Sequence, residues 1–268
     1  PTINIVACPS RRYNTIRYTG CHYSPYRQPI SEMYIRHCQG GTNNSAAIID
    51  DIPDGFDSDV VTTWELGAKT TWLDNRLYLN TALFYNDWED IRVRVNNGRG
   101  TAFTTNGPAA DITGIELDMQ YFATENLRLN LSATYMVAEI AKEEIDPNVA
   151  APFPFNLTLA PEGEDLPGAP RQTYSIKLDY RLPNLLASYD GYASVNASYT
   201  GSTDSAYVAG RFSAGRLSLE SYVLAGLRVG LQNEDWNFAL YVKNLTDEDG
   251  IIGADRAGLG KQFLYRPT

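Results

Sequence analysis

Apolar and polar residues alternate along most of the chain after residue 60, in runs of about ten residues. In the run from Leu127 to Val137, apolar side chains occupy every second position, and Arg128, Asn130, Ser132 and Thr134 lie between them. Successive side chains of a β-strand point to opposite faces, so this period of two predicts strands with one apolar and one polar face. Comparable runs begin at Trp64, Thr113, Tyr174 and Trp236. No segment has a helical period, so we predict an all-β fold.

The connections between these runs alternate strictly between short and long. The short ones span residues 73–76, 123–126, 183–190 and 232–235, and the long ones span 95–111, 139–170, 202–218 and 244–261. Bacterial outer-membrane barrels connect their strands in this way, with tight turns on the periplasmic side and longer loops outside. We therefore predict an incomplete transmembrane antiparallel β-barrel of about eight to ten strands. The short turns should lie on one rim and the long loops, including that around Pro152, on the other.

Aromatic residues close the apolar faces of the predicted strands. Trp64 and Trp72 lie at opposite ends of one such face, as do Tyr174 and Tyr180. Eight residues of tilted strand climb roughly 20 Å, close to the ~25 Å apolar band between the aromatic girdles of a membrane barrel. Aromatic residues are favoured in any sheet, but this placement indicates a lipid-facing surface. Leucines on this face should point to lipid, among them Leu129, Leu178 and Leu240.

Composition excludes several other classes of protein. No run of residues is long and apolar enough for a membrane helix, and a formal net charge of −10 argues against a nucleic-acid partner. Both histidines precede residue 60, and no nucleophile, base and orienting group are arranged for catalysis, so we predict no enzyme activity and no cofactor. Glu116, Asp118 and Asp179 could form an acid/base pair, but charged residues facing water explain them better.

The first 60 residues differ in composition from the rest. Five arginines and one acidic residue precede Asp50, and all three cysteines, Cys8, Cys21 and Cys38, lie there. The pairs Cys21-His22 and His37-Cys38 do not have the spacing of a zinc site, and an odd number of cysteines fits a disulfide framework poorly. We predict no metal site here. This stretch is either an earlier barrel strand and loop or sequence foreign to the barrel, such as a misread or truncated leader.

Four motifs in order resemble the late barrel of TonB-dependent outer-membrane receptors. They are WELGAKTTWLDNRLYLNTALFYNDWEDI at 64–91, NGPAADITGIELD at 106–118, GAPRQTYS at 168–175 and WNFALYVKNLTD at 236–247. The resemblance implies a 22-stranded barrel whose lumen holds an N-terminal plug, with residues 61–268 as its C-terminal part. No plug or TonB-box segment precedes the match, and the chain stops before a complete closing strand. We therefore expect a fragment that cannot transport by itself.

The resemblance also implies a function. Such a receptor lies in the outer membrane of a Gram-negative bacterium, binds a scarce solute and admits it when the TonB energy-transducing complex rearranges the plug. Its partners are outer-membrane lipid, its own plug, the TonB complex and a ferric chelate. A ferric siderophore is the expected solute, with vitamin B12 or an oligosaccharide open. Two other classes also remain: a passive porin or other outer-membrane barrel, and a soluble β-sandwich binding module.

Two groups of residues are candidates for binding. Ligand contacts should come from arginines and exposed aromatic residues of the long loops, unless these only pack or solvate the loops: Arg99, Phe103, Tyr207, Arg211 and Phe212. Charges of both signs on the polar phase of the strands should face the lumen and pair with the plug: Glu116, Asp118, Arg128, Lys177, Asp179, Arg181, Arg228 and Lys243. Clustered carboxylates at Asp247, Glu248 and Asp249 could suggest calcium, but a solvated loop explains them better.

Overall fold

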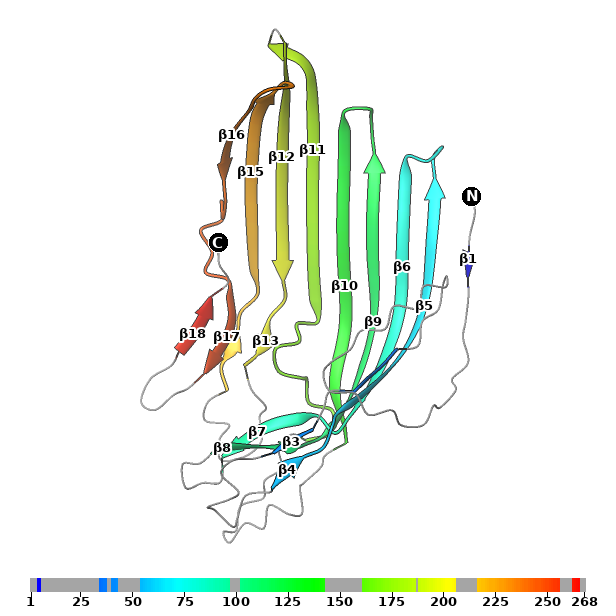
Figure 1. The fold of residues 1–268 in the computed structure, drawn as a ribbon, viewed down its shortest axis with the longest axis vertical. Helices are drawn as coiled ribbons and strands as arrows, with labels where there is room; N and C mark the ends of the chain where they lie inside the picture. The colour runs from blue at the N-terminus through cyan, green and yellow to red at the C-terminus, as the bar shows by residue number, and fades with distance from the viewer. Residues whose placement is uncertain are drawn as a thin grey trace.

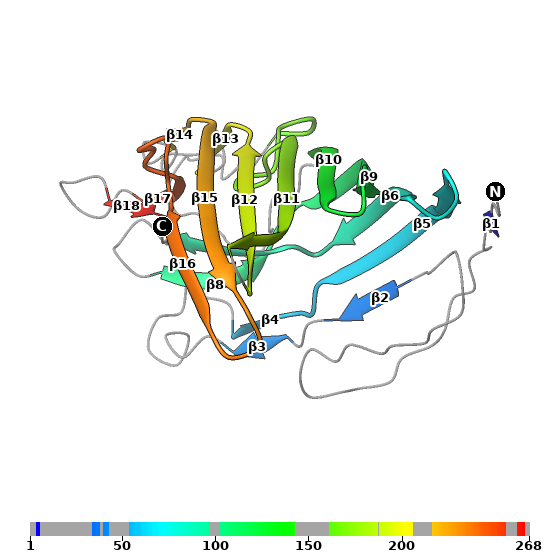
Figure 2. The same ribbon diagram turned by 90° about the horizontal axis from the view of Figure 1, so that it is seen from above.

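One curved antiparallel sheet forms most of the computed structural model (Figures 1 and 2). The structure describes residues 4–5, 34–37, 40–42, 54–96, 102–142, 161–186, 188–205, 216–255 and 262–265. All regular elements in these ranges are strands, and none of them contains a helix that could cross a membrane. The all-β prediction is therefore confirmed, and the sheet forms an incomplete barrel.

The main sheet follows the order of the chain. Its long strands are β5 (Val60–Trp72), β6 (Leu77–Glu89), β9 (Ala109–Phe122), β10 (Leu127–Lys142), β11 (Gln172–Leu186), β12 (Tyr189–Thr200), β15 (Tyr222–Gln232) and β16 (Asn237–Val242). Each pairs with the next in antiparallel register, so every connection is a hairpin or an elaborated hairpin. Two short strands of the first 60 residues, β1 (Asn4–Ile5) and β2 (Tyr34–His37), pair with β5.

Four small two-stranded sheets lie outside this path. They are β3 (Gly41–Thr42) with β4 (Gly55–Phe56), β7 (Arg92–Asn96) with β8 (Ala102–Asn106), β13 (Thr203–Asp204) with β14 (Ser218–Leu219), and β17 (Ile251–Asp255) with β18 (Gln262–Tyr265). Several of these strands fall inside the connections that we predicted as long loops. The long loops therefore contain regular structure of their own.

Short and long connections separate to opposite ends of the sheet. The turns that join β5 to β6, β9 to β10, β11 to β12 and β15 to β16 lie together at the upper end in Figure 1, and the two-stranded pairs β3–β4 and β7–β8 lie at the lower end. The predicted sorting of the connections is confirmed over the described ranges, whereas Pro152 lies outside them. The β11–β12 connection is shorter than predicted, because Leu186 already pairs with Tyr189.

Strand ends are less well predicted than strand phases. β9 has 14 residues and β10 has 16, and both continue beyond the runs of alternating residues. Backbone pairing needs no apolar side chain, so a ladder can continue after the alternation ends. The additional residues lie at the end of the long connections.

The strand pairing places the apolar side chains of neighbouring strands on the same face of the sheet. Leu129 is opposite Tyr121 and Leu178, Leu178 is opposite Val195, and Val229 is opposite Leu240. Side chains of this phase are uncovered in the part of the chain that the structure describes, with 41% of Leu178 and 78% of Leu240 exposed. A continuous uncovered apolar face suits lipid and does not suit a soluble sandwich, which would bury it.

Aromatic pairs occur at both ends of this apolar face. Trp64 and Tyr85 stack with ring centroids 5.4 Å apart near the long connections, as do Tyr174 and Tyr199 at 5.8 Å. Near the short turns, Trp236 stacks on Phe238 at 6.0 Å. Aromatic rings at two levels match the girdles expected at the membrane interfaces.

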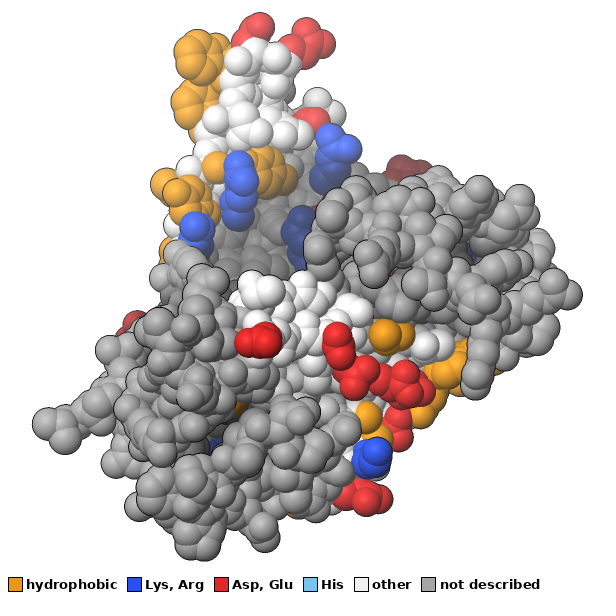
Figure 3. Space-filling view, turned by 60° about the horizontal axis from the view of Figure 1, so that its bottom comes forward, with side chains coloured by type: hydrophobic (Ala, Val, Ile, Leu, Met, Phe, Trp, Pro, Cys, Tyr) orange, Lys and Arg blue, Asp and Glu red, His pale blue; other side chains and the backbone are white. Residues whose placement is uncertain are grey.

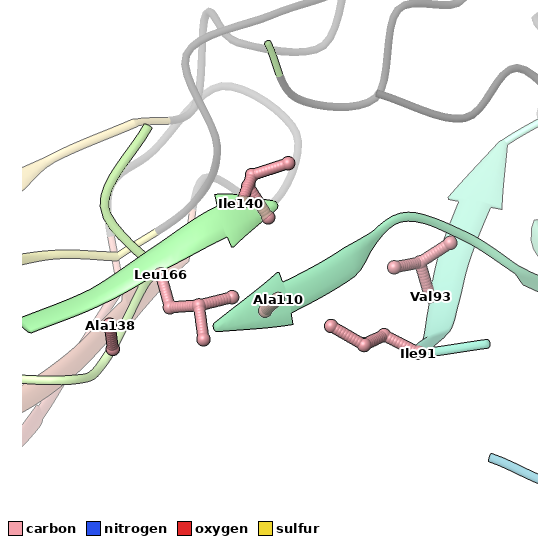
Figure 4. Close-up of a cluster of buried hydrophobic side chains, with 6 residues drawn as sticks. All are labelled: Ile91, Val93, Ala110, Ala138, Ile140 and Leu166. Carbon is pink, nitrogen blue, oxygen red and sulfur yellow. The ribbon is translucent and has the colours of Figure 1, made fainter. Parts of the chain in front are cut away.

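A small buried core lies where the long connections meet the sheet (Figure 4). It contains Ile91, Val93, Ala110, Ala138, Ile140 and Leu166, with Ile140 only 1% exposed. The segment after Pro161 runs back along β10, where the Leu166 amide donates to the Ala138 carbonyl and the Ile140 amide donates to the Glu164 carbonyl. Ala138 and Ile140 have the polar phase of β10, so this end of the polar face carries apolar side chains. The segment after Pro161 covers them and removes them from water.

Glycines on the polar face make room for aromatic rings. At Gly114 an added Cβ would collide with the Phe84 ring of the neighbouring strand and lie 2.9 Å from the Tyr135 carbonyl oxygen, whereas at Gly67 its nearest neighbour would be 3.5 Å away. We expect Gly114→Ala to lower the free energy of unfolding by about 1 to 3 kcal/mol, the usual cost of overpacking. Gly67→Ala is the matched control and should change it by less than about 0.5 kcal/mol. Denaturant unfolding of the complete protein in lipid vesicles measures both, and equal losses would contradict the assigned packing.

Candidate functional site

The polar face of the sheet is concave, and it carries the charged residues selected from the sequence. Glu116, Asp118, Arg128, Lys177, Asp179, Arg181 and Arg228 share this face by register, and Lys243 follows β16 in the same phase. Figure 3 looks into the concave side and shows Lys and Arg side chains gathered around a hollow. This face is the candidate site.

A three-way contact around Asp179 forms the centre of the face. Its carboxylate accepts hydrogen bonds from Arg128 Nη2 at 3.0 Å and Ser194 Oγ at 2.8 Å, and it lies 3.0 Å from Lys177 Nζ. These partners come from β10, β11 and β12, which are neighbours in the sheet. Three of the charges that we expect to face the plug, Arg128, Lys177 and Asp179, also pair with one another within the sheet. Register brings them within reach, and hydrogen bonds to charged groups are the strong ones.

Arg228 is oriented by an aromatic ring instead of a carboxylate. Its guanidinium lies 5.7 Å from the centroid of the Tyr192 ring, and the Tyr192 hydroxyl donates to Asn237 Oδ1 at 2.9 Å. Gly230 lies opposite Tyr192 and leaves space for the ring, since a Cβ there would collide with it. A cation–π contact holds the guanidinium in place and leaves its charge uncompensated.

Two hollows lie side by side on this face. The first has a volume of about 510 Å³ near the short turns, and Arg128, Lys177, Asp179, Arg181 and Arg228 are among its lining residues. The second has about 500 Å³, and its lining residues include Asn196, Ser198, Gly226, Tyr241 and Lys243. Arg228 lines both, so the two hollows are neighbours along β15.

Two arginines organise the end with the long connections. Arg171 contacts Asp165 Oδ1 at 2.6 Å and Glu139 at 3.2 Å, and Arg216 joins Glu164 at 3.3 Å and Asp204. Hydrogen bonds with Asp165 and Asp204 raise the pKa of Arg171 and of Arg216, respectively, so both stay charged. These pairs tie the segment after Pro161 to β10 and β13. Sequence reasoning missed both arginines, although each flanks an acidic stretch or a long loop.

Of the loop residues that we predicted to contact ligand, the structure describes only Phe103. Phe103 lies in β8 and is 4% exposed, so it is buried instead of exposed in a loop. Phe103 is opposite Val95 in the β7–β8 pair, and β8 also lies close to β4, so regular structure surrounds Phe103 where we predicted a loop. Arg99, Tyr207, Arg211 and Phe212 lie outside the described residues.

The NLTD motif after β16 forms a hydrogen-bonded corner. Asn244 Oδ1 accepts from the Glu248 amide at 3.2 Å, and Thr246 Oγ1 donates to the Val223 carbonyl at 2.7 Å. Asn244 and Asp247 both have positive φ, which asparagine and aspartate tolerate better than other side chains. Among the described residues, no group of His, Cys, Asp or Glu side chains could hold a metal ion. Cys8, Cys21, His22 and Cys38 lie outside those ranges.

One family model and several solved structures are similar to this chain. A family model described as TonB dependent receptor-like, beta-barrel, matches residues 19–245. Solved structures with the same fold include the ferric yersiniabactin uptake receptor FyuA from Yersinia pestis, with 16% identity and a TM-score of 0.64 over 89% of this chain and 33% of that one. The siderophore receptor PiuA from Acinetobacter baumannii has 18% identity and a TM-score of 0.58 over 88% of this chain and 32% of that one.

A third solved structure matches a similar share of the chain. The ferric-catecholate import receptor Fiu from E. coli K12, in its closed form, has 21% identity and a TM-score of 0.53 over 88% of this chain and 32% of that one. The chain therefore spans about a third of the length of the structures it matches. At these identities the likeness concerns the fold alone.

Proposed function

The chain belongs to the family of TonB-dependent receptor-like β-barrels, and from this we propose that it forms part of the wall of an outer-membrane receptor that takes up a scarce solute. The family match over residues 19–245 carries this proposal. An uncovered apolar face with aromatic pairs at both ends supports it, since lipid would cover such a face. The concave polar face would then line the interior.

In this proposal the interior is filled by a plug that is rearranged through the TonB complex. Arg181 and Arg228 make no ion pair among the described residues and line the concave face, so carboxylates of a plug could pair with them. A passive porin would have the same strand pattern and a permanently open lumen. The family match favours the energised receptor over the porin.

A ferric siderophore is the proposed solute. Support comes from the matched structures whose names state a ferric yersiniabactin, siderophore or ferric-catecholate receptor. Vitamin B12, an oligosaccharide or another metal chelate is a second class of solute that the same barrel could take up.

Uptake by cells that express the complete protein tests the proposal. Cells that lack their own siderophore receptors should accumulate radioactive iron from a panel of ferric siderophores, and collapse of the inner-membrane proton gradient should abolish uptake. An otherwise identical strain without the protein is the control. Iron entry that persists after collapse of the gradient would favour a porin, and uptake of vitamin B12 or an oligosaccharide alone would replace the siderophore.

A further inference from the structure

A small polar pocket lies on the outer side of the wall, where the lower ends of β11 and β12 in Figure 1 meet the long connections. Its volume is about 270 Å³. Gln172 and Tyr199 line it, and both have the apolar phase of the sheet, because Gln172 is opposite Tyr135 and Tyr199 is opposite Tyr174. The pocket therefore lies on the side that we assign to lipid, and not on the concave face.

Aromatic rings place this pocket at the edge of the apolar face. Tyr174 and Tyr199 stack with ring centroids 5.8 Å apart, and Tyr199 forms one wall of the pocket. Beyond this pair the outer side becomes polar, first at Gln172 and then at Asp165, which is opposite Glu139. Tyr and Trp lie at the headgroup level of a membrane, so a pocket directly beyond such a pair lies among lipid headgroups.

Both carboxylates of the lining already have an arginine partner. Arg171 holds Asp165 through two hydrogen bonds, from Nη2 to Oδ1 at 2.6 Å and from Nε to Oδ2 at 3.3 Å. On the other side of the pocket, Asp204 pairs with Arg216. Neither carboxylate therefore needs a cation from outside, although each keeps lone pairs for further hydrogen bonds. A neutral ligand suits this lining better than an ion.

Uncharged polar groups complete the lining. They are the Gln172 amide and the hydroxyls of Ser202 and Ser218, and no side-chain hydrogen bond engages these groups within the described ranges. Amide and hydroxyl groups both donate and accept hydrogen bonds, so they match a ligand that carries several hydroxyl groups. Pockets for drug-sized ligands measure ~300 to 1,000 Å³, so a pocket of about 270 Å³ restricts the ligand to one small ring.

We propose that this pocket binds the sugar headgroup of a membrane lipid. Gln172, Ser202 and Ser218 hydrogen-bond to the hydroxyl groups of one sugar ring, and the Tyr199 ring packs against its apolar side. The acyl chains of the lipid continue along the apolar face past Tyr174 and Ile176, which are 40% and 45% exposed. This site rests on the proposed membrane location of the wall. It involves neither the plug nor the solute, because it lies on the outer side.

Retention of a glycolipid by the complete protein tests this site. The protein would be reconstituted in nanodiscs of phosphatidylcholine with a minor fraction of monoglucosyl diacylglycerol, and native mass spectrometry would measure the lipid that stays bound. The unmodified protein should retain the glucolipid in preference to phosphatidylcholine. Gln172→Leu/Ser218→Ala should retain it about tenfold less well, because two hydrogen bonds are lost. Gln172→Asn/Ser218→Thr keeps the polar groups and should restore most of the retention.

Thr173→Val/Thr200→Val is the matched control. Thr173 and Thr200 are opposite each other and have the polar phase, so this pair removes two hydroxyls from the other face at the same level of the sheet. Glucolipid retention should not change. Ser202→Ala is a milder variant for the case in which the double variant does not fold, and it should weaken retention about threefold through the loss of one hydrogen bond.

Three results would overturn the proposal. The first is an unmodified protein that shows no preference for the glucolipid over phosphatidylcholine, and the second is equal weakening in the Thr173→Val/Thr200→Val control. The third is displacement of the glucolipid by an equal concentration of methyl glucoside, because the site would then serve a free sugar. Glucolipid retention without energised uptake would leave this site standing and overturn the proposed function, whereas energised uptake without glucolipid retention would do the reverse.

Discussion

Arginine in place of Leu178 or Leu240 is expected to lower the free energy of unfolding of the complete protein in lipid by about 2 to 4 kcal/mol near the bilayer midplane. Both leucines lie on the uncovered apolar face, with 41% of Leu178 and 78% of Leu240 exposed. If this face contacts lipid, the substitution moves a charge into hydrocarbon. Guanidinium titrations in lipid vesicles, followed by tryptophan fluorescence, measure the change.

Asn130 and Leu129 are the matched positions for this experiment. They are adjacent in β10 and have opposite phases, with Asn130 paired to Lys177 and Leu129 paired to Leu178. Leu129→Arg should show the same large loss, whereas Asn130→Arg should cost less than about 1 kcal/mol, because its side chain faces the polar side. Equal sensitivity at Leu129 and Asn130 would contradict the assignment of faces.

Loss of the Asp179 charge is expected to have the second largest effect. Asp179→Asn keeps the shape of the side chain but leaves Arg128 and Lys177 without their shared anion. Hydrogen bonds to charged groups contribute about 1.5 to 3 kcal/mol each, so we expect a loss of about 1 to 3 kcal/mol after solvent screening. The same titration measures it.

Asp118→Asn is the control for this substitution. Asp118 accepts a hydrogen bond from Ser132 Oγ at 2.6 Å on the same concave face, and no ion pair involves it among the described residues. Its replacement should cost less than about 1 kcal/mol. A loss at Asp118 as large as that at Asp179 would mean that general charge balance, and not the three-way contact, stabilises the wall.

Strand phases and turn positions could be predicted from the sequence because both depend on local pattern. Alternation from Leu127 to Val137 fixes which side chains share a face, and the same phase holds through every neighbouring strand. Strand ends could not be predicted, since β10 continues to Lys142 through backbone pairing that the side chains do not encode.

Packing at the long connections could not be predicted for a different reason. Ile140 is buried because Leu166 and Val93, distant in sequence, lie in the same cluster. Phe103 was expected to be exposed, and only the position of β8 in the fold buries it. Such contacts depend on how separate connections fold back on the sheet, which one sequence does not specify.

The candidate site could be predicted from the sequence only in part. Alternation identified the charged residues of the concave face, but register selected their partners. Asp179 joins Arg128 only because β10 and β11 pair in a register that places these residues opposite each other. Arg171 and Arg216 were missed because their partners, Asp165 and Asp204, lie in connections without a periodic pattern.

Spin-label accessibility along β10 tests the central claim most directly, that this sheet is a membrane-barrel wall with lipid on one face and a polar interior on the other. Single cysteines from 129 to 134 would be labelled in the complete protein in lipid bilayers, after Cys8, Cys21 and Cys38 are replaced by serine. We predict that oxygen dissolved in lipid reaches labels at 129, 131 and 133, and not those at 130, 132 and 134. Equal access of a water-soluble nickel chelate to all six positions, or the reversed phase, would contradict the account.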